Sequence, residues 1–210
     1  MITLFDYWRS SAAYRVRIAL NTLGLTYQSL PVDLIKDEQL GAANIARNAQ
    51  GLVPTLQIDG VTLTQSLAII EYLNDTHGGL LPPDPPGRAR VRALSYAIAM
   101  EIAPICNLSV RNHVAAASHG AISVDDWQRH YIGKGLAAVN AMLSDPATGQ
   151  FSHGDEISMA DLCLVPQIYN AERIGFDVAS FPNVARIMQR LRDIPAVAAA
   201  HPDRVKPNGP

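Results

Sequence analysis

The sequence predicts two domains of different class, an α/β domain followed by an all-helical domain. Three observations support this division. Short runs of strand formers alternate with helical patterns up to about His77, residues 78–87 (GGLLPPDPPG) hold four prolines and three glycines, and the later pattern is helical throughout. We therefore expect an α/β domain over residues 1–78, a Pro-rich linker over 79–87 and an all-helical domain over 88–210.

The first two elements are predicted from a change in hydrophobic period. Residues 2–7 (ITLFDY) are short, apolar and rich in strand formers, which is typical of a buried strand. The segment that follows has apolar residues at helical spacing, namely Ala12, Val16, Ala19, Leu20 and Leu23. Its opposite face carries Arg15, Arg17 and Asn21. We expect an amphipathic basic helix that Ser10 or Ser11 caps and Gly24 ends.

Three more strands and two more helical segments complete the predicted α/β domain. A second strand is expected within residues 26–34 (TYQSLPVDL), and a loose helical pattern runs from Asp37 to Asn48. PTLQI and VTLT are two short strands joined by Asp59-Gly60, the strongest hairpin signal in the chain. Ser66 then precedes a helix that ends near His77. The predicted order is β-α-β-α-β-β-α, about the size of a small domain.

The second domain is predicted as a set of helices with clear start signals. The helical patterns cover residues 88–117, 124–143, 159–173 and 182–192. Ser158 and Asp161 form a capping-box pattern at the third of these, and Pro182 stands at the start of the fourth. The terminal segment HPDRVKPNGP is expected to be poorly ordered.

Composition argues against several classes of function. The chain is 48% hydrophobic and 17% charged, with a formal net charge of −2 and no basic stripe, so no nucleic-acid partner is expected. No apolar run reaches the roughly 18 residues of a membrane span, and the N-terminus is acidic where a signal peptide is basic. We therefore expect a cytoplasmic protein without membrane association. Cys106 and Cys163 are interpreted as small core residues, and the scattered histidines predict no metal site.

The segment RSSAAYRVRIAL (residues 9–20) is the first that indicates chemistry, although it contains no nucleophilic cysteine. A β-α-β-α-β-β-α domain with VPT before its third strand suggests the thioredoxin topology. In that topology Pro54 is normally cis, although X-Pro bonds in general are mostly trans, and the backbone of Val53 meets an extended peptide. A helix that starts beside a strand end favours an anion at its free N–H groups. Because redox thioredoxins carry cysteine at this turn and this chain does not, any reacting sulfur has to come from a ligand.

The two domains together resemble a cytosolic glutathione transferase. RSSAAYRVRIAL closely resembles the zeta-class signature, in which two serines and a cysteine precede an aromatic residue and RVRIAL. That class includes maleylacetoacetate isomerase. The likeness continues through VDLIKDEQ, GLVPTLQIDG, TQSLAIIEYL, LLPPDPPGRARVRAL, NLSV, SMADLCLVPQIYNAERIGFDV and FPNVARI. It implies a thioredoxin-like N-terminal domain plus an all-α C-terminal domain, the cytosolic glutathione transferase architecture, with glutathione as cofactor.

The resemblance implies a glutathione site at the starts of two helices. Ser10 is the implied catalytic residue, whose hydroxyl donates a hydrogen bond to the glutathione sulfur. The backbone of Val53 bonds the cysteinyl unit, and Gln65 and Ser66 hold the γ-glutamyl carboxylate. The other implied glutathione-binding residues are Ser11, Ala12, Ala13, Tyr14, Arg15, Gln39, Asn107, Leu108 and Ser109. Taken singly, Ser10 and Ser66 are ordinary helix N-caps, so the assignment depends on their joint occurrence.

The implied activity is the cis–trans isomerisation of maleylacetoacetate to fumarylacetoacetate, in aromatic amino-acid catabolism, with glutathione transferase as a side activity. The implied substrate is a small dianionic diketo acid, which needs cations near both ends. Arg9 and Arg173 stand where the family carries arginine, and a planar guanidinium suits a carboxylate. Arg111 is a third candidate, for which a plain surface arginine is the favoured interpretation. The resemblance also implies a homodimer.

Three positions depart from the family pattern, and the first two of them leave the substrate open. Ala12 replaces the signature cysteine, Ala103 replaces a glutathione-contacting glutamine, and Ala49 replaces a usual proline. Two alternatives lie within the family, namely maleylpyruvate isomerisation, and transferase or dehalogenase activity on small α-halo acids. A non-catalytic ligand-binding or interaction module on the same fold is an alternative from another class.

Overall fold

The computed structural model describes residues 1–207, which fall into two compact units. One unit comprises Met1–Leu80 together with the chain from Asp193 onward, and the other is Leu81–Arg192. The sequence had predicted instead that everything beyond residue 87 belongs to the helical domain.

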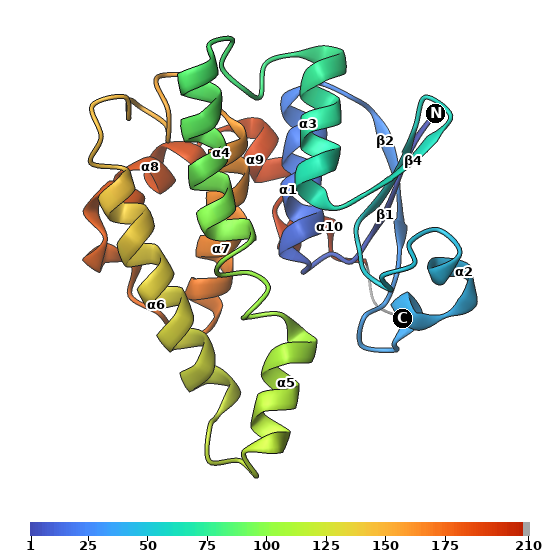
Figure 1. The fold of residues 1–210 in the computed structure, drawn as a ribbon. Coiled ribbons are helices and arrows are strands. Elements are labelled where there is room, and N and C mark those ends of the chain that lie inside the picture. The colour runs from blue at the N-terminus through green and yellow to red at the C-terminus, as the bar shows by residue number, and fades with distance from the viewer. Residues whose placement is uncertain (208–210) are drawn as a thin grey trace. The chain divides into compact units, whose positions relative to one another are not determined.

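A four-stranded sheet organises the first unit (Figure 1). Its strands are β1 (Ile2–Asp6), β2 (Tyr27–Pro31), β3 (Thr55–Ile58) and β4 (Val61–Thr64). The order across the sheet is β2-β1-β3-β4, with β1 parallel to β2 and antiparallel to β3. Strands β3 and β4 form the antiparallel hairpin that Asp59-Gly60 predicted.

Helices complete the first unit. They are α1 (Ser11–Thr22), the 3-10 helix η1 (Glu38–Leu40), α2 (Ala42–Ile45), α3 (Ser66–His77), α9 (Pro195–Ala199) and α10 (Pro202–Val205). Helices α1 and α3 pack against each other and cover one face of the sheet (Figure 1). The predicted order β-α-β-α-β-β-α is confirmed, with two short helical pieces in place of the single loose one.

The amphipathic interpretation of α1 was wrong, because its basic residues are buried. Arg15 and Arg17 are 3% and 1% exposed. Arg17 forms an ion pair with Asp6 of β1 at 2.7 Å, and Arg15 Nη1 donates to Ser66 Oγ at 3.2 Å. The charge of Arg17 is therefore paired inside the unit, which is the condition under which a charged side chain tolerates burial.

The C-terminal segment belongs to the first unit because α1 holds it there. Arg17 Nε donates to the carbonyl oxygen of Ala200 at 3.2 Å, and Asn21 Nδ2 donates to that of Ala196 at 3.1 Å. The predicted poorly ordered tail contains α10 as its first part. Residues 208–210 of that tail lie outside the described residues.

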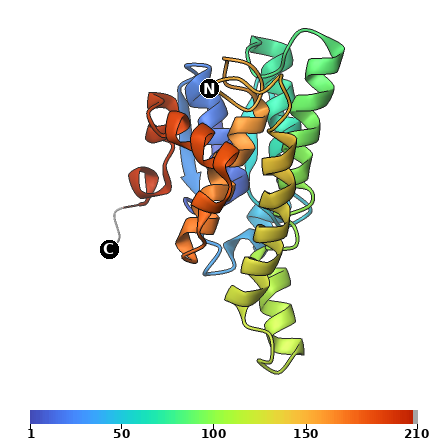
Figure 2. The same cartoon turned by 90° about the vertical axis from the view of Figure 1, so that its left-hand side faces the viewer.

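The second unit is helical, as predicted. Its elements are α4 (Pro85–Ala99), α5 (Leu108–Ala117), α6 (Val124–Met142), α7 (Met159–Arg173), the 3-10 helix η2 (Val178–Ser180) and α8 (Pro182–Arg192). Helix α4 packs against α6 and α7, and α8 packs against the same two helices (Figure 2). The capping box of Ser158 and Asp161 and the helix start at Pro182 are confirmed.

The continuous helix predicted over residues 88–117 was wrong at its start and in its middle, whereas its predicted end agrees with the end of α5 at Ala117. Helix α4 starts at Pro85, inside the expected linker, because Asp84 Oδ1 accepts a hydrogen bond from the Gly87 N–H at 2.7 Å. It ends at Ala99, and the chain then turns through Pro104, whose ring and missing N–H disfavour a helix interior. Asn107 starts a separate helix, α5.

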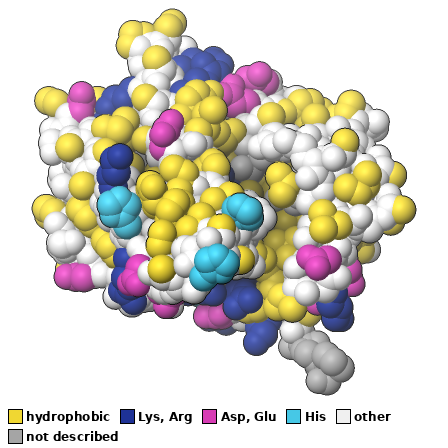
Figure 3. Space-filling view, turned by 60° about the horizontal axis from the view of Figure 1, so that its bottom comes forward, with side chains coloured by type: hydrophobic (Ala, Val, Ile, Leu, Met, Phe, Trp, Pro, Cys, Tyr) yellow, Lys and Arg dark blue, Asp and Glu magenta, His cyan; other side chains and the backbone are white. Residues whose placement is uncertain are grey.

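The surface carries no strong field of one sign on the face that Figure 3 shows, where basic and acidic side chains are interspersed. Within residues 1–207, no helix combines the length and the apolar character needed to span a membrane. The same part of the chain contains no cluster of three or more His, Cys, Asp or Glu side chains able to hold a metal ion.

Candidate active site

The register of the sheet brings three predicted site segments to one end of the first unit. Phe5 of β1 lies opposite Thr55 of β3, which lies opposite Thr64 of β4. Strand β3 is antiparallel to both β1 and β4. The end of β1, the start of β3 and the end of β4 therefore lie side by side. The turn to Ser10, the Val53-Pro54 segment and Gln65 therefore leave the sheet at the same edge.

The start of α1 is arranged to receive an anion. Ser10 is the N-cap, and its Oγ accepts a hydrogen bond from the Ala13 N–H at 3.2 Å. Within residues 1–207 no group accepts a hydrogen bond from the Ser10 hydroxyl or from the N–H groups of Ser11 and Ala12. The first turn also carries no acidic residue. One hydroxyl and two N–H donors, with the positive end of the helix dipole, thus face outward together.

The start of α3 offers a second set of donors. Gln65 is its N-cap and has a positive φ of 65°, a backbone conformation that costs about 1 kcal/mol or more for a non-glycine residue. The side-chain nitrogen of Gln65, Nε2, donates to Gln50 Oε1 at 2.7 Å. Arg15 donates to Ser66 Oγ, so a buried guanidinium ties the first turn of α3 to α1. The start of α3 is therefore polar, carries the positive charge of Arg15 beside it, and is linked through that arginine to α1.

The backbone of Val53 is held in place but not used. The Val53-Pro54 peptide bond is cis, as the thioredoxin topology implied. Asn44 Nδ2 and Asn48 Nδ2 both donate to the carbonyl oxygen of Leu52, at 3.4 and 3.0 Å. Among the described residues, neither the N–H nor the C=O of Val53 has a hydrogen-bond partner. The backbone N–H and C=O of Val53 are therefore available to an extended peptide.

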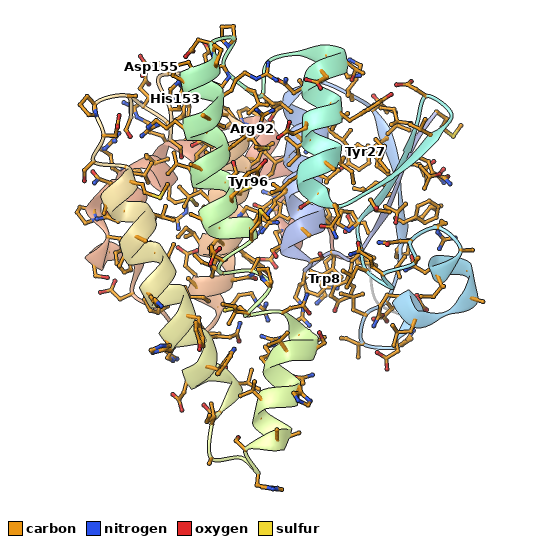
Figure 4. The ribbon with its side chains drawn as sticks, viewed as in Figure 1. Trp8, Tyr27, Arg92, Tyr96, His153 and Asp155 are labelled. Atoms are coloured by element: carbon orange, nitrogen blue, oxygen red, sulfur yellow. The ribbon has the colours of Figure 1, made fainter. Side chains whose placement is uncertain are left out.

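Arg9 lies at the same turn, between Trp8 and Ser10. Its Cζ is 4.9 Å from the centroid of the Trp8 ring, and its Nη2 donates to Tyr7 Oη at 3.4 Å. Figure 4 labels Trp8, which lies at the turn before α1. The aromatic neighbours orient the guanidinium that was predicted to hold a substrate carboxylate.

Other predicted residues of the first unit have structural surroundings. Ala13 and Tyr14 are core residues, at 0% and 1% exposure. The side chain of Gln39 donates to Asp37 Oδ1 at 3.2 Å, and its backbone carbonyl accepts from Asn44 Nδ2 at 2.9 Å. Since Asn44 also bonds Leu52, Gln39 is linked to the Val53 segment through that asparagine.

The remaining predicted residues lie in the second unit. Asn107 caps α5 by accepting a hydrogen bond from the Ser109 N–H at 3.2 Å, and Leu108 is 41% exposed. Arg111 Nη1 donates to Gln128 Oε1 at 2.6 Å. Arg173 is exposed in the last turn of α7, with its Cζ 5.8 Å from the Tyr169 ring. The ligand contacts expected of these residues stay predictions.

Sequence reasoning missed the buried pair of Asp6 and Arg17. Besides bonding Asp6, Arg17 Nη2 donates to the carbonyl oxygen of Trp8 at 2.9 Å, so the pair fixes the turn that precedes Ser10. Burial raises the pKa of Asp6, and the charge and hydrogen bond of Arg17 oppose that shift. The available signal was an acidic residue inside an otherwise apolar strand, followed by arginine in the next helix.

The cysteines do not supply a reactive thiolate. Cys163 is buried in α7, as predicted. Cys106 is only half-buried and lies between α4 and α5 rather than inside a helix. Burial raises the pKa of its thiol to about 11, and the charge of Arg111 only partly opposes this. A sulfur nucleophile at the Ser10 turn therefore has to belong to a ligand.

Comparison with known proteins agrees with this geometry. Residues 1–75 match the family model of the glutathione S-transferase N-terminal domain. The chain is 56% identical over 207 residues to maleylacetoacetate isomerase of Rhizobium meliloti (strain 1021), with 97% of each chain covered. It is 42% identical over 205 residues to the enzyme of the same name from Mus musculus, covering 96% of this chain and 92% of the relative.

The solved structures that resemble this chain belong to the same family. The holo structure of maleyl pyruvate isomerase, a bacterial zeta-class glutathione S-transferase, superposes with a TM-score of 0.93 at 36% identity, covering 99% of this chain and 100% of that one. Maleylacetoacetate isomerase from Anaeromyxobacter dehalogenans 2CP-1 with bound glutathione has a TM-score of 0.88 at 42% identity, covering 100% and 98%. The fold is thus a thioredoxin-like domain with an all-helical domain, and the chain belongs to the zeta-class glutathione transferases of the maleylacetoacetate isomerase family.

Proposed function

We propose that this protein is a glutathione-dependent cis–trans isomerase that converts maleylacetoacetate to fumarylacetoacetate. The observation that carries the proposal is the open start of α1, where Ser10 offers a hydroxyl and the helix offers free N–H donors in a unit whose sequence contains no cysteine. Relatives named maleylacetoacetate isomerase that match over nearly the whole chain support the choice of reaction.

The residues present fit glutathione. The tripeptide has an extended backbone, a thiol in its middle and a carboxylate at its γ-glutamyl end. The unused backbone of Val53 suits the extended part, and the donors at Ser10 suit the sulfur. The start of α3, with Gln65, Ser66 and the buried Arg15, suits the carboxylate. When bound, glutathione supplies a thiolate that adds reversibly to the cis double bond, so that rotation about the resulting single bond precedes its elimination.

The task of Ser10 is to stabilise the thiolate form. A free thiol with a pKa near 8.5 is only a few per cent ionised at neutral pH, and each unit of pKa lowering needs about 1.4 kcal/mol of selective stabilisation. One charge-assisted hydrogen bond from the Ser10 hydroxyl supplies an interaction of that size, and the N–H groups of Ser11 and Ala12 add to it. No general base is required for this step.

The task of Arg9 is to hold one carboxylate of the diketo acid near the sulfur. Its guanidinium is kept at the turn by Trp8 and Tyr7, so little side-chain entropy is lost when a carboxylate binds. We assign the second carboxylate to Arg173, on the basis of the family resemblance alone.

An absorbance assay tests the proposal directly. Purified protein, glutathione and maleylacetoacetate should show glutathione-dependent loss of the cis compound and formation of the trans product. S-methylglutathione, which has no free thiol, is the matched control and should support no turnover. Absence of turnover of both maleylacetoacetate and maleylpyruvate would reject the isomerase. Retention on immobilised glutathione that is lost in Gln65→Ala would then favour a binding module.

Maleylpyruvate is the second candidate substrate. The structural likeness to a maleyl pyruvate isomerase, at a TM-score of 0.93, favours it, whereas the higher sequence identities to maleylacetoacetate isomerases favour the first candidate. Comparing kcat/KM for the two acids decides between them. Restoring the family cysteine by Ala12→Cys should shift that ratio if the replacement affects how the substrate is oriented.

The remaining predictions of the sequence extend this proposal. A homodimer is supported by the family resemblance, and sedimentation analysis should give about twice the 22.7 kDa mass of the chain. The cytoplasmic location and the place in aromatic amino-acid catabolism have the same support and stay predictions.

A further inference from the structure

Two cations lie against the indole ring of Trp8 at the turn before Ser10. The Cζ of Arg9 is 4.9 Å from the ring centroid, and the Nζ of Lys206 is 5.3 Å from the same point. A cation within about 6 Å of an aromatic centroid is attracted by the face of the ring. Lys206, which lies near the C-terminus, therefore contacts the same ring as Arg9.

The position of Lys206 depends on a buried anchor. The guanidinium of Arg17, which is 1% exposed, donates both to the carbonyl oxygen of Trp8 and to that of Ala200. The rings of His201 and Tyr14 are nearly perpendicular, in a T-shaped contact with 6.2 Å between their centroids. The chain that leads through α10 to Lys206 is thus fixed to the turn that carries Trp8 and Arg9.

Within the described part of the chain, no carboxylate neutralises the positive charge at this turn. Among residues 1–207, neither Arg9 nor Lys206 forms an ion pair with a carboxylate. Asp6, the acid in the strand that leads into the turn, is already paired with Arg17. Asp203, the acid on the same segment as Lys206, lies 3.7 Å from His201 Nδ1. The two cations are therefore available to an anionic ligand.

We propose that Lys206 is a substrate-binding residue that, together with Arg9, holds the carboxylates of a dianionic acid at the start of α1. This inference rests on the proposed function, since it takes a dicarboxylate as the ligand of that site. Arginine offers a planar two-donor fork and lysine a compact point charge on a flexible stem, so the pair accommodates acids of different length. Because the attraction acts equally on bound substrate and transition state, it affects KM rather than kcat.

The experiment compares three variants in the full chain. Lys206→Met removes the charge but keeps an unbranched stem against Trp8, Lys206→Arg keeps the charge, and Lys134→Met removes an exposed charge from α6 as the control. For Lys206→Met we expect KM for the diketo acid to rise about three- to fivefold, the scale of one exposed ion pair, with kcat and the KM for glutathione unchanged. Lys206→Arg and Lys134→Met should match the unaltered protein.

A binding measurement separates this inference from the proposed function. Succinate is a saturated dicarboxylate that cannot add a thiolate, so its affinity for the glutathione-loaded protein is independent of turnover. Calorimetry should show a three- to fivefold weaker affinity for succinate in Lys206→Met, and less than a twofold change for monomethyl succinate.

Two outcomes would overturn the inference while leaving the isomerase intact. One is an unchanged KM for the acid and an unchanged affinity for succinate in Lys206→Met. The other is a rise confined to the KM for glutathione, which would assign Lys206 to the carboxylates of the tripeptide. Conversely, an absence of turnover in the unaltered protein, with the expected loss of succinate affinity in Lys206→Met, would reject the proposed reaction and retain Lys206 as a dicarboxylate-binding residue.

Discussion

Helices α1 and α7 both begin with a serine N-cap, yet one start is open and the other is closed. In α7 the fourth residue of the pattern is Asp161, whose carboxylate accepts hydrogen bonds from the Ser158 N–H, the Ser158 hydroxyl and the Ser152 N–H. In α1 the corresponding residue is Ala13, whose N–H donates to Ser10 Oγ but whose side chain offers no acceptor. The same local motif thus serves stability where an acid fills it, whereas a methyl group leaves the start of α1 open for the ligand binding that we propose.

The largest expected effect comes from removing the acidic residue that closes the start of α7. Asp161→Ala leaves the buried donors of Ser152 and Ser158 without an acceptor, so the free energy of unfolding should fall by about 3 kcal/mol. Urea denaturation followed by circular dichroism measures this loss. Asp126→Ala is the matched control, because Asp126 occupies the same position after Ser123 in α6 but is exposed. A loss below 1 kcal/mol in Asp161→Ala would contradict this account of α7.

Removing the hydroxyl at the open start should affect turnover more than stability. Ser10→Ala deletes the proposed donor to the thiolate, so kcat should fall about 100-fold, as for other single donors that face a developing or bound anion. The free energy of unfolding should change by about 1 kcal/mol, the value of one N-cap.

Ser123→Ala, which removes the N-cap of α6, is the control for Ser10→Ala. It should cost similar stability and leave kcat unchanged. A kcat in Ser10→Ala that stays within threefold of the original would show that the N–H groups of the helix stabilise the thiolate without the hydroxyl.

Placing an acid at the open start should partly close it. Ala12→Asp introduces a carboxylate beside the free N–H groups of the first turn, where it stabilises the helix by about 0.5 kcal/mol and repels a thiolate. We expect KM for glutathione to rise about tenfold, equivalent to about 1.4 kcal/mol. Ala12→Asn, of nearly the same shape without the charge, should change it less than threefold. Equal effects of the two would indicate a steric cause instead.

The two helix starts also show how far local sequence predicts this protein. Ser158-x-x-Asp161 is a complete local signal, and α7 has the predicted bounds. The Ser10 segment gives an equally local cap, so the helix and its anion-favouring start were predictable. The burial of Arg15 and Arg17 was not, because their partners Ser66 and Asp6 come from other elements.

Long-range contacts explain the other misses as well. Helical period alone does not reveal that residues after Asp193 return to α1, since the contact is made by Arg17 to a backbone carbonyl. Pro104 indicates the break between α4 and α5 locally. The helical spacing of apolar residues on both sides of it favoured a continuous helix instead. The specific positions of the site residues came from the family resemblance, because no spacing rule predicts that Val53, Ser10 and Gln65 meet at one sheet edge.

The smallest expected effect concerns the thiol of Cys106, which belongs to the second unit. With a pKa of about 11, Cys106 is thiolate to less than about one part in a thousand at pH 7.5, so iodoacetamide should modify it slowly. Cys106→Ser should leave turnover within twofold, because the reacting sulfur belongs to glutathione. Mass spectrometry of the alkylated protein and the kcat of the variant measure both points. Rapid alkylation of Cys106, with loss of turnover in Cys106→Ser, would place a protein thiol in the reaction and remove the reason for an open start at Ser10.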